Sequence, residues 1–289
     1  MNRAILDLYH EFRHTPMPRR EFLEKLTKVA GSAAAAATIL PLLEGDVQAA
    51  QVAPDDPKLE AATLTYPGPA GAVTAYQARP KGAGALPAVV VIHENRGLNN
   101  HIRDVARRAA LAGYHALAPD LLTRKGGTPP VQEEAIAAIR ALPREDALAD
   151  LRAGVAFLQK SAQVAEGRVG VVGFCWGGAM VNLLAANEPG LKAAVAFYGA
   201  VAPAAMVPQI QAPLFLIYAG NDKRINDQVP AYEEALKKAK KNYTIQMYPN
   251  VEHAFHNDTA GVRYNAAAAK DAWAKTVAFF GKHLKAAAN

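Results

Sequence analysis

Short apolar runs rich in β-branched residues alternate with helix-like segments from Leu59 onward. The runs at 88–92 and 168–173 lack the polar–apolar alternation of a half-exposed strand, which predicts strands buried on both faces. Helical patterns lie between such runs, for example over 102–112 and 265–283. Because buried parallel strands need a layer of helices on each side, the sequence predicts an α/β fold. We expect a mostly parallel central sheet with helices on both faces.

The composition sets the class of protein and limits its partners. With 51% hydrophobic and 20% charged residues, the 289-residue chain is typical of folded globular proteins. Residues 59–289 show no composition break or repeat, so we expect one domain there, preceded by a flexible lead-in at 51–58. The net charge of +6 is compatible with anionic substrates or with an ordinary solvated surface. No aromatic-interleaved basic patch and no glycine-rich phosphate loop is present, so we expect neither nucleic-acid binding nor a cofactor.

Residues 1–50 have the organisation of an export signal, and we place them outside the domain fold. Arg19 and Arg20 are followed by an uncharged, alanine-rich run over 29–43, and small residues at 49–50 offer a cleavage site. The RR-x-F-L pattern resembles the twin-arginine type of signal, which exports folded proteins. The apolar run is shorter than the ~20 residues that span a bilayer. We therefore predict a periplasmic or secreted protein without a stable membrane anchor after cleavage; an uncleaved anchor and a disordered tail are the alternatives.

The chain has a single cysteine, Cys175, so it cannot form an internal disulfide. Cys175 lies in the segment GFCWG, between the predicted strand 168–173 and a predicted helix over 177–186. A glycine two residues before and two residues after it lets the chain turn sharply. The positive end of the following helix favours the thiolate form. The pattern predicts that Cys175 is a nucleophile at a tight elbow; the alternative is a small buried residue.

A later aspartate and a later histidine complete a predicted catalytic triad. Asp222 follows the predicted strand 214–219, and His253 follows the predicted strand 244–248. Nucleophile, acid and histidine occur in the order found in α/β-hydrolases, with room for a strand and a helix between successive members. His253 is predicted to accept the proton of the thiol or of a water molecule, while Asp222 fixes its tautomer. Taken alone, each of the two would be an ordinary turn or loop residue.

The loop after the strand at 88–92 reads HENRGL and supplies further candidates. The backbone N–H groups of Trp176 and Asn95 are predicted to bind the oxyanion. Aromatic residues near the site either line an apolar pocket or fill the core. The candidate substrate-binding residues are Phe174, Trp176, Tyr198, Phe255 and Arg96.

These features together make the chain resemble the dienelactone hydrolase (carboxymethylenebutenolidase) family over about residues 61–284. The specific parts are GFCWGG at 173–178, GND at 220–222 and HAFH at 253–256. The resemblance implies an α/β-hydrolase sandwich and a Cys–His–Asp triad. It also implies cleavage of a lactone or carboxylic ester through a thioester acyl-enzyme.

The same resemblance implies a role for Glu94, in the HENRGL loop. In the family a glutamate at this position holds the cysteine at rest until substrate arrives. A carboxylate beside a thiol disfavours the thiolate beforehand, which is consistent with such a role. The alternative is a loop carboxylate paired with Arg96 or Arg103.

The sequence does not identify the substrate, because it departs from the family at the arginines that bind the substrate carboxylate. Members that cleave dienelactone hold the substrate carboxylate with arginines, one of them shortly after the catalytic histidine. Here the next arginine is Arg263, and Arg124, Arg140 and Arg144 in the stretch before the elbow are not placed by any motif. An esterase or thioesterase acting on another substrate, and a non-catalytic binding protein, are the alternative functions. We expect a monomer or a weak oligomer.

A metal site is the remaining alternative, because His253 and His256 are three residues apart and Asp258 is close by. The zinc-binding patterns of hydrolases, H-E-x-x-H or clustered cysteines and histidines, do not occur in the sequence. We therefore predict no metal ligands, and we expect His256 to be a supporting or surface residue.

Overall fold

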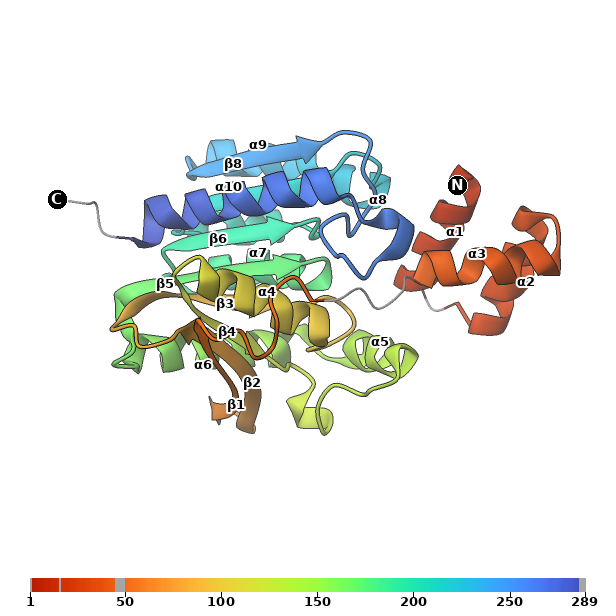
Figure 1. Cartoon of the computed structure of the whole chain (residues 1–289). Helices are drawn as coiled ribbons and strands as arrows, with labels where there is room; N and C mark the ends of the chain where they lie inside the picture. The colour runs from red at the N-terminus through yellow and green to blue at the C-terminus, as the bar shows by residue number, and fades with distance from the viewer. Residues whose placement is uncertain (1, 16, 45–49, 286–289) are drawn as a thin grey trace.

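Eight strands form one sheet at the centre of the structure, a computed structural model that describes residues 2–15, 17–44 and 50–285. The strands follow the order β1-β2-β4-β3-β5-β6-β7-β8 across the sheet. The pairs β1–β2 and β2–β4 are antiparallel and the remaining neighbours are parallel, which confirms the predicted sheet (Figure 1). The strands are β1 (Leu59–Gly68), β2 (Gly71–Pro80), β3 (Leu86–Ile92), β4 (His115–Pro119), β5 (Val164–Phe174), β6 (Ala193–Phe197), β7 (Leu214–Ala219) and β8 (Tyr243–Tyr248).

Helices connect the strands and cover both faces of the sheet. They are α4 (Asn100–Leu111), α5 (Gln132–Ala141), α6 (Arg144–Lys160), α7 (Trp176–Asn187), α8 (Lys223–Asn226), α9 (Val229–Lys238) and α10 (Ala266–Leu284). Short 3₁₀ turns are η1 (Thr123–Lys125), η2 (Ala204–Gln209) and η3 (Gly261–Arg263). The predicted helices at 102–112 and 265–283 match α4 and α10 to within two residues at each end, the usual uncertainty of helix boundaries.

The continuous apolar runs are explained by two core layers. Val89 and Val91 of β3 pack in one layer with residues of α4 and α10. Val90 and Ile92 point to the opposite face and pack in the other layer with residues of α6, α7 and α9. Because successive side chains of a strand point to opposite faces, a strand covered on both sides must be apolar at every position.

Five of the parallel strands bring the candidate catalytic residues to one edge. Glu94 follows β3, Cys175 follows β5, Tyr198 follows β6, Asp222 follows β7 and His253 lies five residues beyond β8. In an open α/β sheet the carboxyl ends of parallel strands meet at the same edge, where ligands bind. Residues spread over 160 positions of sequence therefore become neighbours.

Residues before the domain form three further helices, α1 (Arg3–His14), α2 (Arg19–Ala30) and α3 (Ala33–Glu44). We call them the N-terminal bundle. The bundle has an apolar core of its own, made by Ile5, Leu8, Tyr9, Phe22, Leu26, Ala36 and Leu43. It lies beside the carboxyl edge of the sheet (Figure 1). The sequence placed residues 1–50 outside the fold, whereas here the spacing of apolar residues at three and four positions builds helices that pack together.

The predicted export signal covers this bundle. Of its predicted cleavage residues, Ala49 lies outside the described part of the chain, and Ala50 is the first residue after that gap. Within the described residues, no helix is long and apolar enough to cross a membrane.

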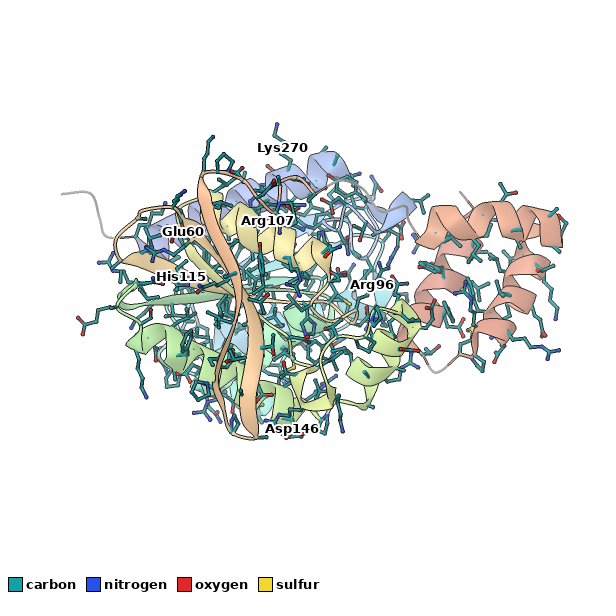
Figure 2. All side chains as sticks on the ribbon, turned by 60° about the horizontal axis from the view of Figure 1, so that its bottom comes forward. Glu60, Arg96, Arg107, His115, Asp146 and Lys270 are labelled. Atoms are coloured by element: carbon teal, nitrogen blue, oxygen red, sulfur yellow. The ribbon has the colours of Figure 1, made fainter. Side chains whose placement is uncertain are left out.

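The stretch predicted to be a flexible lead-in begins with anchored residues. The backbone N–H groups of Gln51 and Val52 donate to the carboxylate of Asp104 at 3.2 and 2.8 Å. Arg107 of α4 donates to the carbonyl of Val52 at 2.8 Å and to the hydroxyl of Tyr76 at 3.1 Å (Figure 2). These buried polar contacts tie the start of the domain to α4, a constraint that composition alone did not indicate.

Candidate active site

Cys175 occupies a strained turn between β5 and α7. Its φ of 54° is unusual for a residue with a side chain, and its N–H donates to the carbonyl of Phe197 at 3.0 Å. A Cβ atom at Gly177 would overlap the carbonyl oxygens of Ile92 and His93, and one at Gly173 would overlap the carbonyl of Gly177. The two flanking glycines are therefore required by close backbone approach, as the G-x-C-x-G pattern predicted.

His253 lies between the predicted acid and the predicted nucleophile. Its Nδ1 donates to Oδ2 of Asp222 at 2.5 Å, and both side chains are buried. Burial alone lowers the pKa of the imidazole, but the negative charges of Cys175 and Asp222, and hydrogen bonds to both, outweigh it and raise the pKa to about 9. The ring is therefore set up to remain protonated beside the cysteine at neutral pH.

Asp222 is held by the start of α8 as well as by the histidine. It is the N-cap residue of α8, where its Oδ1 accepts from the N–H of Ile225 at 3.4 Å. The carboxylate of Asp222 thus both caps α8 and orients the ring of His253. The structure brings together the three residues of the predicted triad.

Glu94 is buried and lines a small cavity of about 10 Å³ together with Cys175 and His253. Its Oε2 accepts from Nδ2 of Asn257 at 2.5 Å, and its Oε1 accepts from the hydroxyl of Tyr198 at 3.4 Å. Burial acts to raise the pKa of this carboxyl group, but nearby positive charges, first that of a histidine on α4, lower it below its usual range. Glu94 is therefore ionised and fixed in place.

The structure separates the two arginines that were the alternative partners of Glu94. Arg103 lies over the ring of Tyr76 at 5.3 Å, whereas Arg96 lines the same small cavity as Glu94, and its positive charge helps to lower the pKa of that carboxyl group.

Asn257 was not among the predicted site residues. It follows His256, in the stretch where family members that cleave dienelactone have an arginine. Its place four residues after His253 was the signal that could have identified it.

Both predicted oxyanion donors lie beside the nucleophile. Trp176 is the first residue of α7, where a backbone N–H has no acceptor within the helix. Its ring stacks on that of His93 at 5.5 Å. Asn95 lines both cavities that reach Cys175.

The candidate substrate-binding residues separate into two groups. Trp176 and Tyr198 line the main cavity, and Arg96 lines the smaller one beside Glu94. Phe174 and Phe255 are fully buried in the core, packed against neighbouring aromatic rings. Of the two possibilities that the sequence left open, the structure places these two phenylalanines in the core.

His256 lies in a buried cluster behind the site. Its ring stacks on that of Phe174 at 4.9 Å and lies 6.1 Å from that of His101. Nδ1 of His101 contacts Oδ1 of Asp258 at 2.8 Å. Burial lowers the pKa of His256 well below its usual value. Among the described residues no group of three histidine, cysteine, aspartate or glutamate side chains is arranged to hold a metal ion.

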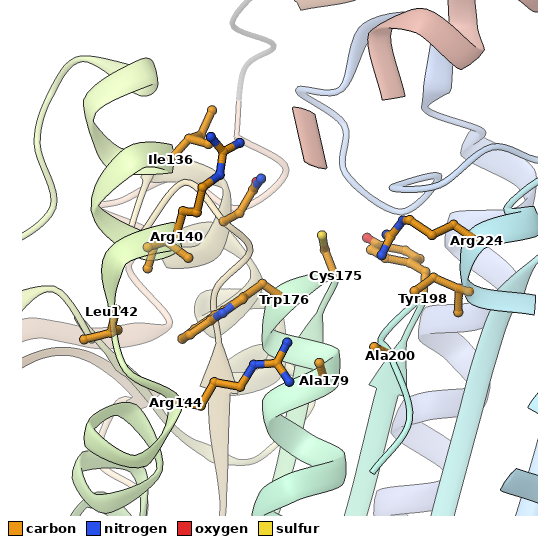
Figure 3. A pocket seen from close by; sticks show the side chains of 13 residues that line it. Ile136, Arg140, Leu142, Arg144, Cys175, Trp176, Ala179, Tyr198, Ala200 and Arg224 are labelled. Carbon is orange, nitrogen blue, oxygen red and sulfur yellow. The ribbon is translucent and has the colours of Figure 1, made fainter. Parts of the chain in front are cut away.

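The main cavity has a volume of about 280 Å³ and opens directly above Cys175 (Figure 3). Arg140 and Arg144 flank it on one side and Arg224 on the other, and its described lining contains no acidic residue. Arg124, the other arginine of the stretch before the elbow, pairs instead with Asp146 and a second aspartate of α6. Arg224 is not among the residues that the sequence predicted for the site, although its place two residues after Asp222 was a usable signal.

Comparison with known proteins agrees with this geometry. A model of the dienelactone hydrolase family matches residues 73–284. A Methylorubrum extorquens protein provisionally named carboxymethylenebutenolidase is 33% identical over 246 residues, which cover 80% of this chain and 84% of that protein. A Bradyrhizobium protein provisionally named 2-oxo-3-(5-oxofuran-2-ylidene)propanoate lactonase is 33% identical over 223 residues, which cover 73% of this chain and 89% of that protein.

A solved structure gives the same result for the fold. The structure of a provisionally assigned dienelactone hydrolase from Klebsiella pneumoniae superimposes with a TM-score of 0.71 at 33% identity, covering 78% of this chain and 99% of that one. The α/β-hydrolase fold expected from the sequence is thereby confirmed. This chain belongs to the dienelactone hydrolase family and is a hydrolase of a small-molecule lactone or ester.

Proposed function

We propose that the protein cleaves a carboxylate-bearing lactone or ester through a covalent thioester on Cys175. The observation that carries this proposal is the bond of His253 to Asp222 beside the cysteine at the elbow. Once Cys175 is a thiolate beside the imidazolium of His253, it is a strong nucleophile, and the proton for the leaving group is in place.

The proposed reaction has two halves. Sγ of Cys175 attacks the carbonyl carbon, and the N–H groups of Trp176 and Asn95 stabilise the oxyanion. The carbon–oxygen bond then breaks, and the departing alkoxide takes the proton of His253. In the second half neutral His253 takes a proton from water, the resulting hydroxide attacks the thioester, and the carboxylic acid and the thiolate are released.

Glu94 is included in this proposal as the group that holds the cysteine at rest. Its support is the cavity that it shares with Cys175 and the two hydrogen bonds, from Asn257 and Tyr198, that fix its carboxylate.

The direct test uses the full chain and follows the hydrolysis of a dienelactone and of an activated aryl ester by absorbance. Intact-mass spectrometry after rapid acid quenching detects the acyl group on the protein. Turnover of either compound with an acyl adduct on the cysteine supports the mechanism. Absence of both turnover and adduct with every lactone and ester tried would refute it.

The proposed carboxylate rests on the charge of the main cavity. Arg144 and Arg224 line it, and neither pairs with a carboxylate among the described residues. The Bradyrhizobium relative is named for a lactone that carries an ionised carboxyl group. Unpaired guanidinium groups bind carboxylates strongly, often through two parallel hydrogen bonds.

Replacing Arg144 or Arg224 by alanine is expected to raise KM for a carboxylate-bearing aryl ester by about tenfold, the effect of losing one hydrogen bond to a charged group. KM for the matched neutral ester should change far less. Arg152→Ala is the control, because Arg152 lies on the same helix as Arg144 and pairs with Glu188 outside the cavity. Equal changes for the charged and neutral esters would contradict the proposal.

We also infer that the protein is exported by its twin-arginine-type segment. The support is the sequence of residues 1–50, and the inference predicts that the exported form begins near residue 50. N-terminal sequencing of protein from the periplasm or the medium checks this. An exported form that begins before residue 29 would exclude the cleavage proposed here.

A further inference from the structure

The N-terminal bundle is attached to the two loops that carry the acid and the base. One Nη atom of Arg3 donates to Oε1 of Glu252 at 2.9 Å, and the other donates to the carbonyl of Asn221 at 2.9 Å. Glu252 and Asn221 directly precede His253 and Asp222. A single guanidinium group of α1 therefore bridges both catalytic loops.

A second contact reaches the smaller cavity. The guanidinium group of Arg263 lies over the ring of Tyr9 at 5.2 Å, and Tyr9 is fully buried. Arg263 belongs to η3, against which α3 packs, and it lines the cavity that contains Glu94 and Cys175. Arg96, which lines the same cavity, lies at the end of the domain nearest the bundle (Figure 2). The bundle thus covers this side of the site.

A third contact lies on the opposite rim. Arg19 of α2 pairs with Glu133 of α5 at 2.9 Å, and Arg140 of α5 donates to the carbonyl of Thr15 at 2.8 Å. Arg140 also lines the main cavity above Cys175. The bundle is therefore held at both rims of the catalytic edge, by the β7 and β8 loops on one side and by α5 on the other.

The contacts between the N-terminal bundle and the domain allow the bundle to dissociate. Its main apolar side chains pack within the bundle, while the ion pairs that Arg3 and Arg19 make with the domain join partly exposed groups. Exposed ion pairs contribute only about 0–1 kcal/mol each. A void of about 180 Å³ lies between Phe12 and Met17 of the bundle and Ile136 and Ala137 of α5. A second void of about 560 Å³ lies between α1 and the loops that carry Asp222 and His253, beside the contacts of Arg3.

We propose that the N-terminal bundle is a removable cap that limits the size of the molecules reaching Cys175. The proposal rests on the proposed function, because it concerns access to the same nucleophile. With the cap in place Cys175 is 8% exposed, and small molecules enter through the arginine-lined cavity. Removal of the cap opens the side occupied by α1 and admits larger acyl or alcohol groups.

The predicted export signal gives the cap a means of removal. The proposed cut at 49–50 comes after the end of α3 at Glu44 and before β1, so one cleavage separates all three helices from the domain. The chain would act on small substrates before that cut and on a wider range after it.

The test uses the full chain with a specific-protease site in place of residues 45–49. The protein is purified folded and then cut, and the released helices are separated. Because Cys175 is the only cysteine, the rate of thiol alkylation measures access to it without any substrate. Cutting is expected to raise the rate with a bulky maleimide by about tenfold, as for the opening of a lid, and to change the rate with iodoacetamide less than about twofold. An unchanged ratio of the two rates would overturn the proposal.

Point variants of the uncut chain provide the matched control and do not depend on the fold of the cut protein. Arg3→Ala combined with Arg19→Ala removes two interface pairs and is expected to raise the bulky-to-small ratio. Arg20→Ala combined with Lys25→Ala removes pairs that lie within the bundle and should leave the ratio unchanged. Equal ratios in the two double variants would contradict the cap.

The two proposals fail separately in these experiments. A changed alkylation ratio without hydrolysis of any ester would preserve the cap and refute the proposed function. Cysteine-dependent hydrolysis with the same ratio of rates for bulky and small aryl esters before and after cutting would preserve the function and refute the cap.

Discussion

Replacing Cys175 by alanine is expected to lower kcat for ester hydrolysis by about 10⁴-fold or more, because no other side chain at the elbow can form the acyl-enzyme. Removal of Sγ also takes away the acyl acceptor, so the adduct seen by mass spectrometry should disappear. The measurement is hydrolysis of an activated aryl ester by the wild type and the variant at equal concentration.

Two controls separate loss of chemistry from loss of fold. Cys175→Ser keeps an oxygen nucleophile of similar size in the same turn and tests whether the thiol itself is needed. The temperature of unfolding should change little in either variant, because the side chain is small and the turn is held by the backbone bond to Phe197. Retention of more than about one hundredth of wild-type turnover by a folded Cys175→Ala protein would rule out the assigned nucleophile.

Asp222→Asn is expected to lower kcat by about 10³- to 10⁴-fold while leaving the fold intact. An amide no longer fixes the Nδ1–H tautomer of His253 or stabilises its imidazolium form. The amide oxygen can still cap α8 by accepting from Ile225, which is why asparagine is a better choice than alanine. Comparison of kcat with the temperature of unfolding distinguishes a catalytic from a structural role.

The same variant should change the dependence on pH. In the wild type the pKa of His253 is raised to about 9, so kcat/KM is expected to fall as pH rises through about 9 and the leaving group loses its proton donor. The raised pKa also adds stability that is fully present below pH 6.5 and is lost between pH 6.5 and about 9. Asp222 is one of the charges that raise this pKa, so Asp222→Asn should move the alkaline limb to lower pH. A limb at the same pH in both proteins would contradict the role of Asp222.

The sequence alone predicted the central sheet, the elbow and the meeting of Cys175, Asp222 and His253. Each of these depends on a local pattern: a continuous apolar run, glycines at fixed offsets from Cys175, or a polar residue after a strand. The topology of the sheet then determines that these residues meet. Parallel strands end at one edge, which brings Asp222 and His253 close to Cys175 whatever the intervening residues are. The substitution of one surface residue for another would not have altered these predictions.

Only the tertiary structure decided which neighbours those residues have. Phe174 and Phe255 lie close to the triad in sequence, yet their rings point into the core, while Arg224 points into the cavity. The bond from Asn257 to Glu94 joins residues 163 positions apart, and no periodic pattern marks such a pair.

The N-terminal bundle shows the same limit. In the sequence, its arginines and alanine-rich run indicate an export signal. No local pattern shows that Arg3 contacts Glu252 or that Tyr9 contacts Arg263. Such contacts depend on which surfaces remain uncovered after the sheet and its helices have packed. Periodicity determines which face of an element is buried, whereas the partner of each polar side chain is determined by three-dimensional packing.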